Sequence, residues 1–342
     1  MTKRFYSLDF ARGLAAIGIV VFHFFGPSVE AFKALFFFVD FFFVLSGFVL
    51  ARSIQEIKNR GSLRIFIFHR ALRLFPMALA GISYVISIQL IVNLRDLVLH
   101  NSIQKGIDLS PATLVLNILL LQVFSTHSQL LLFPLWSLSA EWLTNLTYAF
   151  SRMATRRMEM YLIPIGLVLT ILHLSNNLQG DLDSVVGSMG RCIYGFGVGI
   201  FIHNRYVRGR QVDRIKFSTF LVLLLSFLLY LSYFLVGMNF LLILPLGFGV
   251  CILLMASESK NLSSRYLKVS KFLGKHSYGI YVWHVPMANS ITLVVKNIYP
   301  DSQLAHSQLL HFVLTLLLSA FASQIVISLI EAPLRRKALK YL

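Results

Sequence analysis

Two ionisable residues, Arg12 and His23, lie eleven positions apart in the first apolar stretch of the chain. At about 100° per residue, eleven steps return to within roughly 20° of whole turns, so both side chains project from one helix face. A rise of about 1.5 Å per residue separates them by about 16 Å along the axis. We therefore expect Arg12 near one membrane surface and His23 near the middle of the bilayer, where an ionisable side chain is costly and indicates function.

A second group of candidates is basic and precedes an expected membrane span. Within Phe66–Pro76, His69, Arg70 and Arg73 occupy positions i, i+1 and i+4. Arg70 and Arg73 then lie on adjacent parts of one helical face. Guanidinium groups are planar and permanently charged, which suits them to phosphate oxygens. The same residues could instead orient the chain and contact lipid headgroups, and the residues alone leave both interpretations open.

Further ionisable residues lie inside or at the ends of apolar stretches: Asp40, Glu141, Arg191, His284 and Glu331. Taken alone, several of them have a structural interpretation. His284 could hydrogen-bond a neighbouring helix, and Glu331 could pair with the basic residues that follow it. Asp40 could simply hold a cation such as Arg191. Together with His23, these side chains are best accommodated around a shared polar cavity, because a charge in hydrocarbon needs a partner or water.

The composition indicates an integral membrane protein. Hydrophobic residues make up 57% of the 342 residues, 13% are charged, and the mean hydropathy is +0.74. We predict one all-α membrane domain over residues 1–342, with about ten transmembrane helices around the polar cavity. The expected spans are 12–30, 33–51, 74–94, 134–151, 160–175, 186–203, 217–236, 239–256, 277–295 and 307–330.

The net charge of +17 is explained by membrane topology. If both termini lie on one side, most basic residues fall on the loops of that side. The opposite side carries only Lys33, Arg95, Lys105 and Lys296. The positive-inside rule then places both termini in the cytoplasm. We expect contact with membrane lipids and no nucleic-acid partner.

The segment 95–133 is expected to lie outside the membrane core on the outer side. Its apolar run Leu114–Phe124 is too short to span a bilayer with confidence, and a span there would invert every later loop. Ser110 is a suitable N-cap and Pro111 suits the first helical position. We predict a re-entrant or interfacial helix there.

Small residues inside the spans indicate packing. The run Gly195–Gly199 is similar to a phosphate-binding loop only superficially, because it lies inside an expected span and matches neither nucleotide-binding pattern. Close helix contact is the better interpretation. Cys192 and Cys251 also fall inside spans and show no zinc-ligand spacing, so we expect no metal.

Taken in order along the chain, these motifs resemble the acyltransferase 3 family of integral membrane acyltransferases, in its polysaccharide O-acetyltransferase type. The resemblance runs from the first expected span to the last. It is carried by Arg12 with His23, Val39–Gly47 around Asp40, Phe66–Pro76, Trp136–Trp142 around Glu141, Ser277–Pro286 around His284, and Glu331–Arg335. At His69 the chain departs from the family, which more often has a second arginine there.

The resemblance implies a transfer from an acyl-CoA donor, acetyl-CoA in particular, to a sugar hydroxyl. The acceptor would be an envelope glycan or its lipid-linked precursor, at the cytoplasmic (inner) membrane of a bacterium. The donor carries phosphates, so we expect it to dock at the basic inner face. Arg12, Arg70 and Arg73 would hold those phosphates, with His69 beside them.

The same resemblance assigns the chemistry to residues deeper in the membrane. His23 would act as general base on the acceptor hydroxyl or form a transient acyl-histidine, since imidazole has an unperturbed pKa of about 6.5. Glu141 or Asp40 would orient His23. His284 would position the thioester or stabilise its oxyanion.

A transporter or flippase for a polar lipid-linked sugar is the alternative. Membrane carboxylates and histidines also build proton relays. The sequence shows no inverted repeat and no paired broken helices, which argues against this alternative. The arginines suited to phosphate also lie on one side only.

Overall fold

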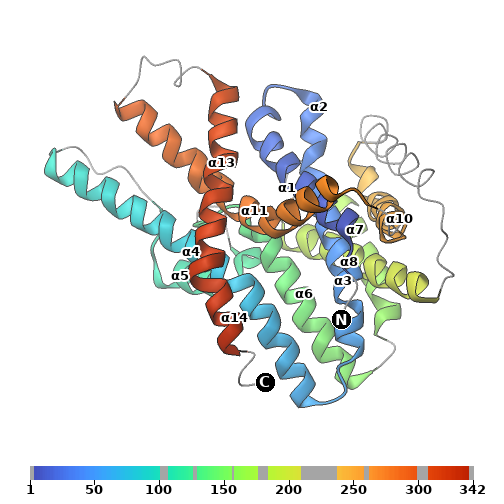
Figure 1. Ribbon diagram of the computed structural model, residues 1–342. Helices are drawn as coiled ribbons and strands as arrows, with labels where there is room; N and C mark the ends of the chain where they lie inside the picture. The colour runs from blue at the N-terminus through green and yellow to red at the C-terminus, as the bar shows by residue number, and fades with distance from the viewer. Residues whose placement is uncertain are drawn as a thin grey trace. The chain divides into compact units, whose positions relative to one another are not determined.

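The computed structural model describes residues 4–100, 107–125, 129–155, 158–175, 184–208, 237–257, 262–298 and 307–338 (Figure 1). Within these ranges the regular elements are helices and there is no strand. The chain divides into two compact units, which are described separately. The first comprises Met1–Phe66 and Ala140–Tyr278, and the second comprises Ile67–Ser139 and Gly279–Leu342.

Five helical stretches of the described chain are long and apolar enough to cross a membrane: Tyr6–Phe25, Glu30–Gln55, Arg60–Val98, Val185–Val207 and Gln308–Ala338. An all-helical protein with membrane-crossing segments is therefore confirmed. The expected span 217–236 lies outside the described residues, and each of the other expected spans falls on a described helix. The number of ten spans and the cytoplasmic location of both termini stay predictions.

The first unit is built around helices α3 (Phe38–Gln55) and α8 (Val185–Arg208), which pack along each other (Figure 1). Helices α1 (Tyr6–Phe25), α7 (Glu159–Ser175) and α10 (Leu244–Ala256) surround them. The 3-10 turns η1 (Ala34–Phe37) and η4 (Gly237–Leu242) precede α3 and α10, and α2 (Glu30–Lys33) follows α1. Buried aromatic side chains fill the core between them, including Phe37, Phe41, Phe48, Phe240 and Phe248.

Glycines bring the backbones of α3 and α8 into direct contact, as the run Gly195–Gly199 predicted. A β-carbon at Gly199 would overlap the carbonyl oxygen of Val44, and one at Gly47 would overlap that of Phe196. Gly197 faces α7 more loosely, since a β-carbon there would lie 3.0 Å from the backbone nitrogen of Ile163. Small residues at a helix contact allow close backbone approach, which is a principal source of packing energy within a bilayer.

Replacing Gly199 with alanine is expected to lower the free energy of unfolding by about 1–3 kcal/mol, because the overlapping atoms of α3 are backbone and cannot rotate away. The matched control is Gly61→Ala, where only the flexible side chain of Asn59 lies near, at 3.3 Å. Thermal unfolding in detergent micelles measures both variants. A Gly199→Ala protein as stable as the Gly61→Ala control would contradict the close-contact interpretation.

The second unit contains most of α4 (Arg60–Val98) and the later part of α11 (Ser264–Ile298). It also contains α5 (Pro111–Ile118), the 3-10 turn η2 (Gln122–Phe124) and the start of α6 (Leu135–Ala154). The C-terminal stretch is α13 (Gln308–Val326), the π-helical turn η5 (Ile327–Glu331) and α14 (Ala332–Ala338). Tyr84 and Ser290 join α4 to α11 through their hydroxyls, 2.8 Å apart.

The start of α5 is as predicted, and its end is not. The side chain of Ser110 accepts a hydrogen bond from the Thr113 amide, and Pro111 is the first helical residue. Asp108 supports this cap, and its hydrogen bond from the Thr113 hydroxyl, with a further bond from the Ser110 amide, lowers the pKa of Asp108. The helix ends at Ile118, whereas the apolar run continues to Phe124.

Buried amide side chains explain this early end. Leu120 adopts a left-handed backbone conformation, and Asn117 then holds the returning chain. The Asn117 amide donates to the carbonyl of Gln129 at 2.8 Å and accepts from the Leu131 N–H at 3.3 Å. Non-helical backbone inside protein needs such partners. The outer, non-spanning location of 95–133 stays a prediction, and residues 101–106 and 126–128 of it lie outside the described residues.

Candidate active site

Helix α1 carries Arg12 and His23 on one continuous helix, as their spacing predicted. The helix begins at Tyr6 and ends at Phe25, so the expected span 12–30 is displaced. The displacement has a local cause, because Pro27 follows Gly26 and has no N–H to donate to the carbonyl of His23, so the regular helix stops there. His23 therefore lies in the last turn of α1, in edge contact with the ring of Phe22 at 4.9 Å. Its depth in the bilayer stays a prediction.

Arg12 lies at the opposite end of α1, beside Asp9. The Asp9 carboxylate is 2.6 Å from the Arg4 guanidinium and 3.8 Å from that of Arg12. The same carboxylate lies against Gly274 of α11, and Gly13 lies against Leu273. Helix α1 is thus fixed to the first part of α11, and Arg12 keeps a side chain that is 27% exposed. A partly exposed guanidinium is available to an anionic group.

Asp40 and Arg191 form a fully buried ion pair between α3 and α8. The Arg191 Nε donates to Asp40 Oδ1 at 3.1 Å, and Nη2 donates to Oδ2 at 2.7 Å. Both side chains are 1% exposed, and the ring of Phe36 lies 5.0 Å from the guanidinium carbon. This bidentate geometry bears out the structural alternative for Asp40, which holds Arg191 in place. A further role for Asp40 in orienting His23 stays a prediction.

Glu141 on α6 is bound to α3 through Ser46. The Ser46 hydroxyl donates to Glu141 Oε1 at 2.7 Å. Three residues further on, the Thr144 hydroxyl donates to Cys192 Sγ on α8 at 3.3 Å. Within the first unit, α3, α6 and α8 therefore hold Glu141 and the Asp40–Arg191 pair. Ser46 was not among the predicted site residues, although it lies in the motif that contains Asp40.

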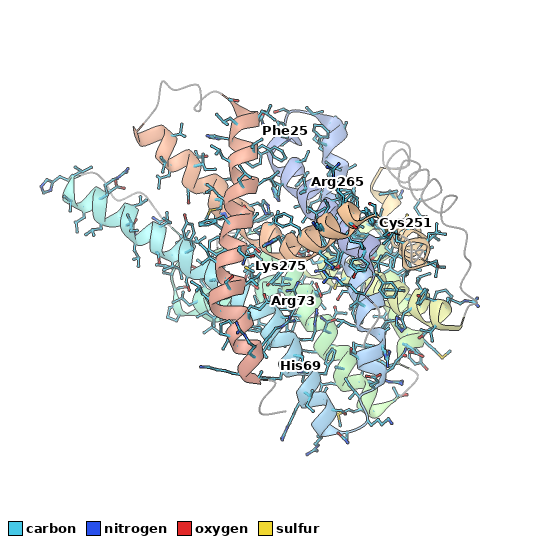
Figure 2. The ribbon with its side chains drawn as sticks, viewed as in Figure 1. Phe25, His69, Arg73, Cys251, Arg265 and Lys275 are labelled. Atoms are coloured by element: carbon cyan, nitrogen blue, oxygen red, sulfur yellow. The ribbon has the colours of Figure 1, made fainter. Side chains whose placement is uncertain are left out.

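In the second unit, Arg73 on α4 is bound by Glu331. Arg73 Nη1 lies 3.1 Å from Glu331 Oε1, and Arg335 reaches the same oxygen at 3.7 Å. The sequence predicted that Glu331 pairs with the basic residues that follow it, as it does with Arg335. It did not predict Arg73 on α4 as the closer partner of Glu331. Glu331 is buried at the end of the π-helical turn η5, and such turns are frequent at functional sites. Figure 2 shows Arg73 on α4 with the exposed His69 on the same helix, and Arg70 between them is partly buried.

His284 on α11 is 1% exposed and has a defined orientation. Its Nδ1 lies 2.8 Å from the carbonyl oxygen of Tyr281, so Nδ1 carries the proton that this carbonyl accepts. In a neutral ring Nε2 is then an acceptor, and His284 would stabilise an oxyanion only as an imidazolium. The Tyr281 hydroxyl in turn donates to the carbonyl of Pro134 at 2.8 Å and lies 2.6 Å from Ser137 Oγ.

The predicted site residues are divided between the two units. Arg12, His23, Asp40 and Glu141 belong to the first, and His69, Arg70, Arg73 and His284 belong to the second. In the described ranges, no group of three or more histidine, cysteine or acidic side chains is placed to bind a metal ion.

The profile of the Acyl_transf_3 family, described as an acyltransferase domain, matches residues 5–329. The chain belongs to this acyltransferase family. The match includes every site residue named above except Glu331 and Arg335. It favours acyl transfer over the transporter alternative and supports a multi-pass membrane acyltransferase.

The acyltransferase is also similar to O-acetyltransferase OatA of Staphylococcus aureus. The proteins of strains NCTC 8325 / PS 47, COL and MRSA252 are each 26% identical to it over 367 aligned residues. The alignment covers 98% of this chain and 58% of each relative, so the chain spans less than two thirds of their length. No solved structure matches this chain.

Proposed function

We propose that this acyltransferase moves an acetyl group from acetyl-CoA in the cytoplasm to a hydroxyl of an envelope glycan or its lipid-linked precursor, in the inner membrane of a bacterium. The observation that carries the proposal is the similarity to O-acetyltransferases over 98% of the chain. Within that length the acyltransferase holds a histidine, a carboxylate and several arginines of the types that this reaction needs.

Donor binding is assigned to Arg12, Arg70 and Arg73, with His69 beside them. Each guanidinium offers several N–H donors in a planar fork, which fits the phosphates of CoA. Arg73 already binds an oxygen anion, since the Glu331 carboxylate lies 3.1 Å from it. Its side chain is 24% exposed, so it is not sealed inside the protein.

The transfer step is assigned to His23. The acceptor hydroxyl oxygen attacks the thioester carbonyl carbon while the imidazole takes the hydroxyl proton. The carbon–sulfur bond then breaks, and the CoA sulfur leaves and takes up the proton from His23. In the two-step form, the imidazole nitrogen attacks the thioester carbon, the carbon–sulfur bond breaks and CoA leaves as its thiolate. The acceptor hydroxyl then attacks the acyl-histidine, the carbon–nitrogen bond breaks to free the imidazole, and the hydroxyl proton passes to the thiolate. Glu141, held by Ser46, would orient the imidazole in both forms.

Donor recognition gives a direct test of the proposal. CoA should raise the melting temperature of the purified protein, because a ligand that binds only the folded state stabilises it. Arg73→Ala should weaken CoA binding by about 10- to 150-fold, since hydrogen bonds to charged groups contribute about 1.5–3 kcal/mol. Each variant is compared with its own melting temperature without CoA, so any loss of stability from removing the Arg73–Glu331 pair cancels.

The matched control is Arg95→Ala, at the far end of the same helix, where the arginine binds Asp96 at 2.7 Å. This variant should keep the wild-type response to CoA. An unchanged affinity in Arg73→Ala would assign Arg73 to chain orientation alone. A wild-type protein that CoA does not stabilise would argue against a CoA-dependent enzyme.

A further inference from the structure

Two fully buried polar side chains of the first unit, Asn145 on α6 and Ser188 on α8, have unsatisfied hydrogen-bonding groups. Asn145 is 0% exposed, and neither its amide nitrogen nor its amide oxygen has a hydrogen-bond partner among the described residues. Ser188 is 1% exposed, and its hydroxyl likewise has no partner in the described ranges. A buried polar group without a partner keeps its full desolvation penalty, so an asparagine with both amide atoms in this state requires an explanation.

Two side-chain contacts fix how α6 and α8 align. The Thr144 hydroxyl lies 3.3 Å from Cys192 Sγ, and one turn later the rings of Tyr148 and Phe196 lie 5.9 Å apart. Both pairs are separated by the same number of residues, so the two helices run side by side in the same direction. One turn before the Thr144 contact, Ser188 on α8 is therefore level with Ala140 on α6, the residue next to Glu141.

The same periodicity groups the polar side chains around Glu141. Asn145 follows Glu141 by four residues and so lies on the same face of α6, about 6 Å further along the axis. Ser188 precedes Arg191 by three residues on α8, so it lies beside the Asp40–Arg191 pair. The unsatisfied groups thus flank the proposed orienting carboxylate, and the contacts of Glu141 and Arg191 to α3 bound the same region.

The chemistry of this group favours a neutral hydroxyl ligand. The amide of Asn145 and the hydroxyl of Ser188 can each donate and accept a hydrogen bond, which matches the two roles of a sugar hydroxyl. The charge of Arg191, the basic residue of the group, is balanced by the Asp40 carboxylate, so the group has no net positive charge to attract a phosphate. Glu141 adds an acceptor and a negative charge, which also disfavours an anion.

We propose that Asn145 and Ser188 bind the sugar acceptor, through its hydroxyl groups, beside Glu141. This assignment rests on the proposed acetyl transfer and adds the acceptor site to it. Ser188 lies in the first turn of α8 and Asn145 lies midway along α6, and the predicted topology places the first half of each helix toward the outer side. The acceptor arrives from that side, whereas the donor phosphates bind at the inner face.

The test combines acceptor kinetics with thermal stability for Asn145→Leu, which keeps the side-chain volume and removes both polar atoms. With oligosaccharides released from the host's own envelope as acceptor, the variant should show at least about tenfold lower kcat/KM for the oligosaccharide, at unchanged KM for acetyl-CoA. Without substrate its melting temperature should rise by about 2–4 °C, because an unsatisfied buried amide has been removed. Ser188→Ala should change both measurements in the same directions.

The matched control is Thr147→Val on α6, where the exposed hydroxyl bonds only its own helix at Leu143. It should leave both measurements unchanged. An Asn145→Leu protein with a lower melting temperature and unchanged acceptor kinetics would overturn the assignment, since the amide would then have a structural role. If the wild-type protein itself transfers no acetyl group, the proposed function fails. If the wild type transfers acetyl groups and Asn145→Leu has the same kcat/KM for the oligosaccharide, the acceptor assignment fails and the proposed function stands.

Discussion

Replacing His23 with alanine is expected to reduce acetyl transfer by at least 10²–10⁴-fold, because that is the usual contribution of a positioned general base. The side chain lies in the last turn of α1, where alanine is compatible with the helix, so the protein should still accumulate in the membrane. The measurement is transfer of labelled acetyl groups from acetyl-CoA in inverted membrane vesicles, normalised to the amount of protein present.

His311→Ala provides the control for this experiment. His311 lies in the first turns of α13, in the second unit, and has no role in the proposed transfer. Its activity should remain within about twofold of wild type, because substitutions away from a functional feature usually have small effects. Near-normal transfer by His23→Ala would remove His23 from the mechanism, both as a base and as an acyl carrier.

The second large effect is expected for Asp40→Leu. This change leaves the Arg191 guanidinium buried at 1% exposure without its bidentate partner. Breaking a buried pair on one side typically costs about 3–5 kcal/mol, because the remaining charge is uncompensated. The variant should show a much lower melting temperature in micelles and reduced accumulation in the membrane.

The double variant Asp40→Leu/Arg191→Met separates structure from catalysis. Replacing both members of a buried pair with apolar residues is often neutral, so the double variant should recover most of the lost stability. If it also recovers acetyl transfer, Asp40 acts only by holding Arg191, and Glu141 is the remaining candidate to orient His23. A single variant as stable as wild type would contradict the importance of this pair.

Local features of this chain could be predicted from the sequence. Apolar length indicated the helices, the Ser110–Pro111 pair indicated the start of α5, and the glycine run indicated a close helix contact, without its partner α3. These features depend on side chains close together in the sequence or on one helix face. The candidate residues themselves were found because ionisable groups are conspicuous in apolar segments.

Partner choice could not be predicted in the same way. Arg73 and Glu331 are 258 positions apart, and nothing local to either indicates the other. The sequence predicted a pair of Glu331 with the basic residues that follow it, such as Arg335, because those residues lie about one helical turn away. Ser46 was overlooked because a serine in a membrane helix is usually bonded within its own helix, whereas here it binds Glu141 on α6.

The ends of two helices also differ between the sequence-based expectation and the structure. The apolar pattern continues past Ile118, so hydropathy alone extends α5 too far, and the expected span 12–30 extended α1 past the Gly26–Pro27 pair. The α1 helix ends at Gly26 and Pro27, and α5 ends where Asn117 binds the backbone that follows. The missing N–H of a proline decides the first position, and side-chain hydrogen bonds decide the second. The shift of α1 is the one that matters for chemistry, since it moves His23 to the end of its helix.

The central claim, acetyl transfer to an envelope glycan, is tested most directly by the masses of the envelope glycans. These are compared between cells that produce the wild-type protein, cells that lack the gene, and cells that produce His23→Ala. We expect glycan species heavier by one acetyl group with the wild-type protein, and their loss in both other strains. Identical glycan masses in all three strains would contradict the account.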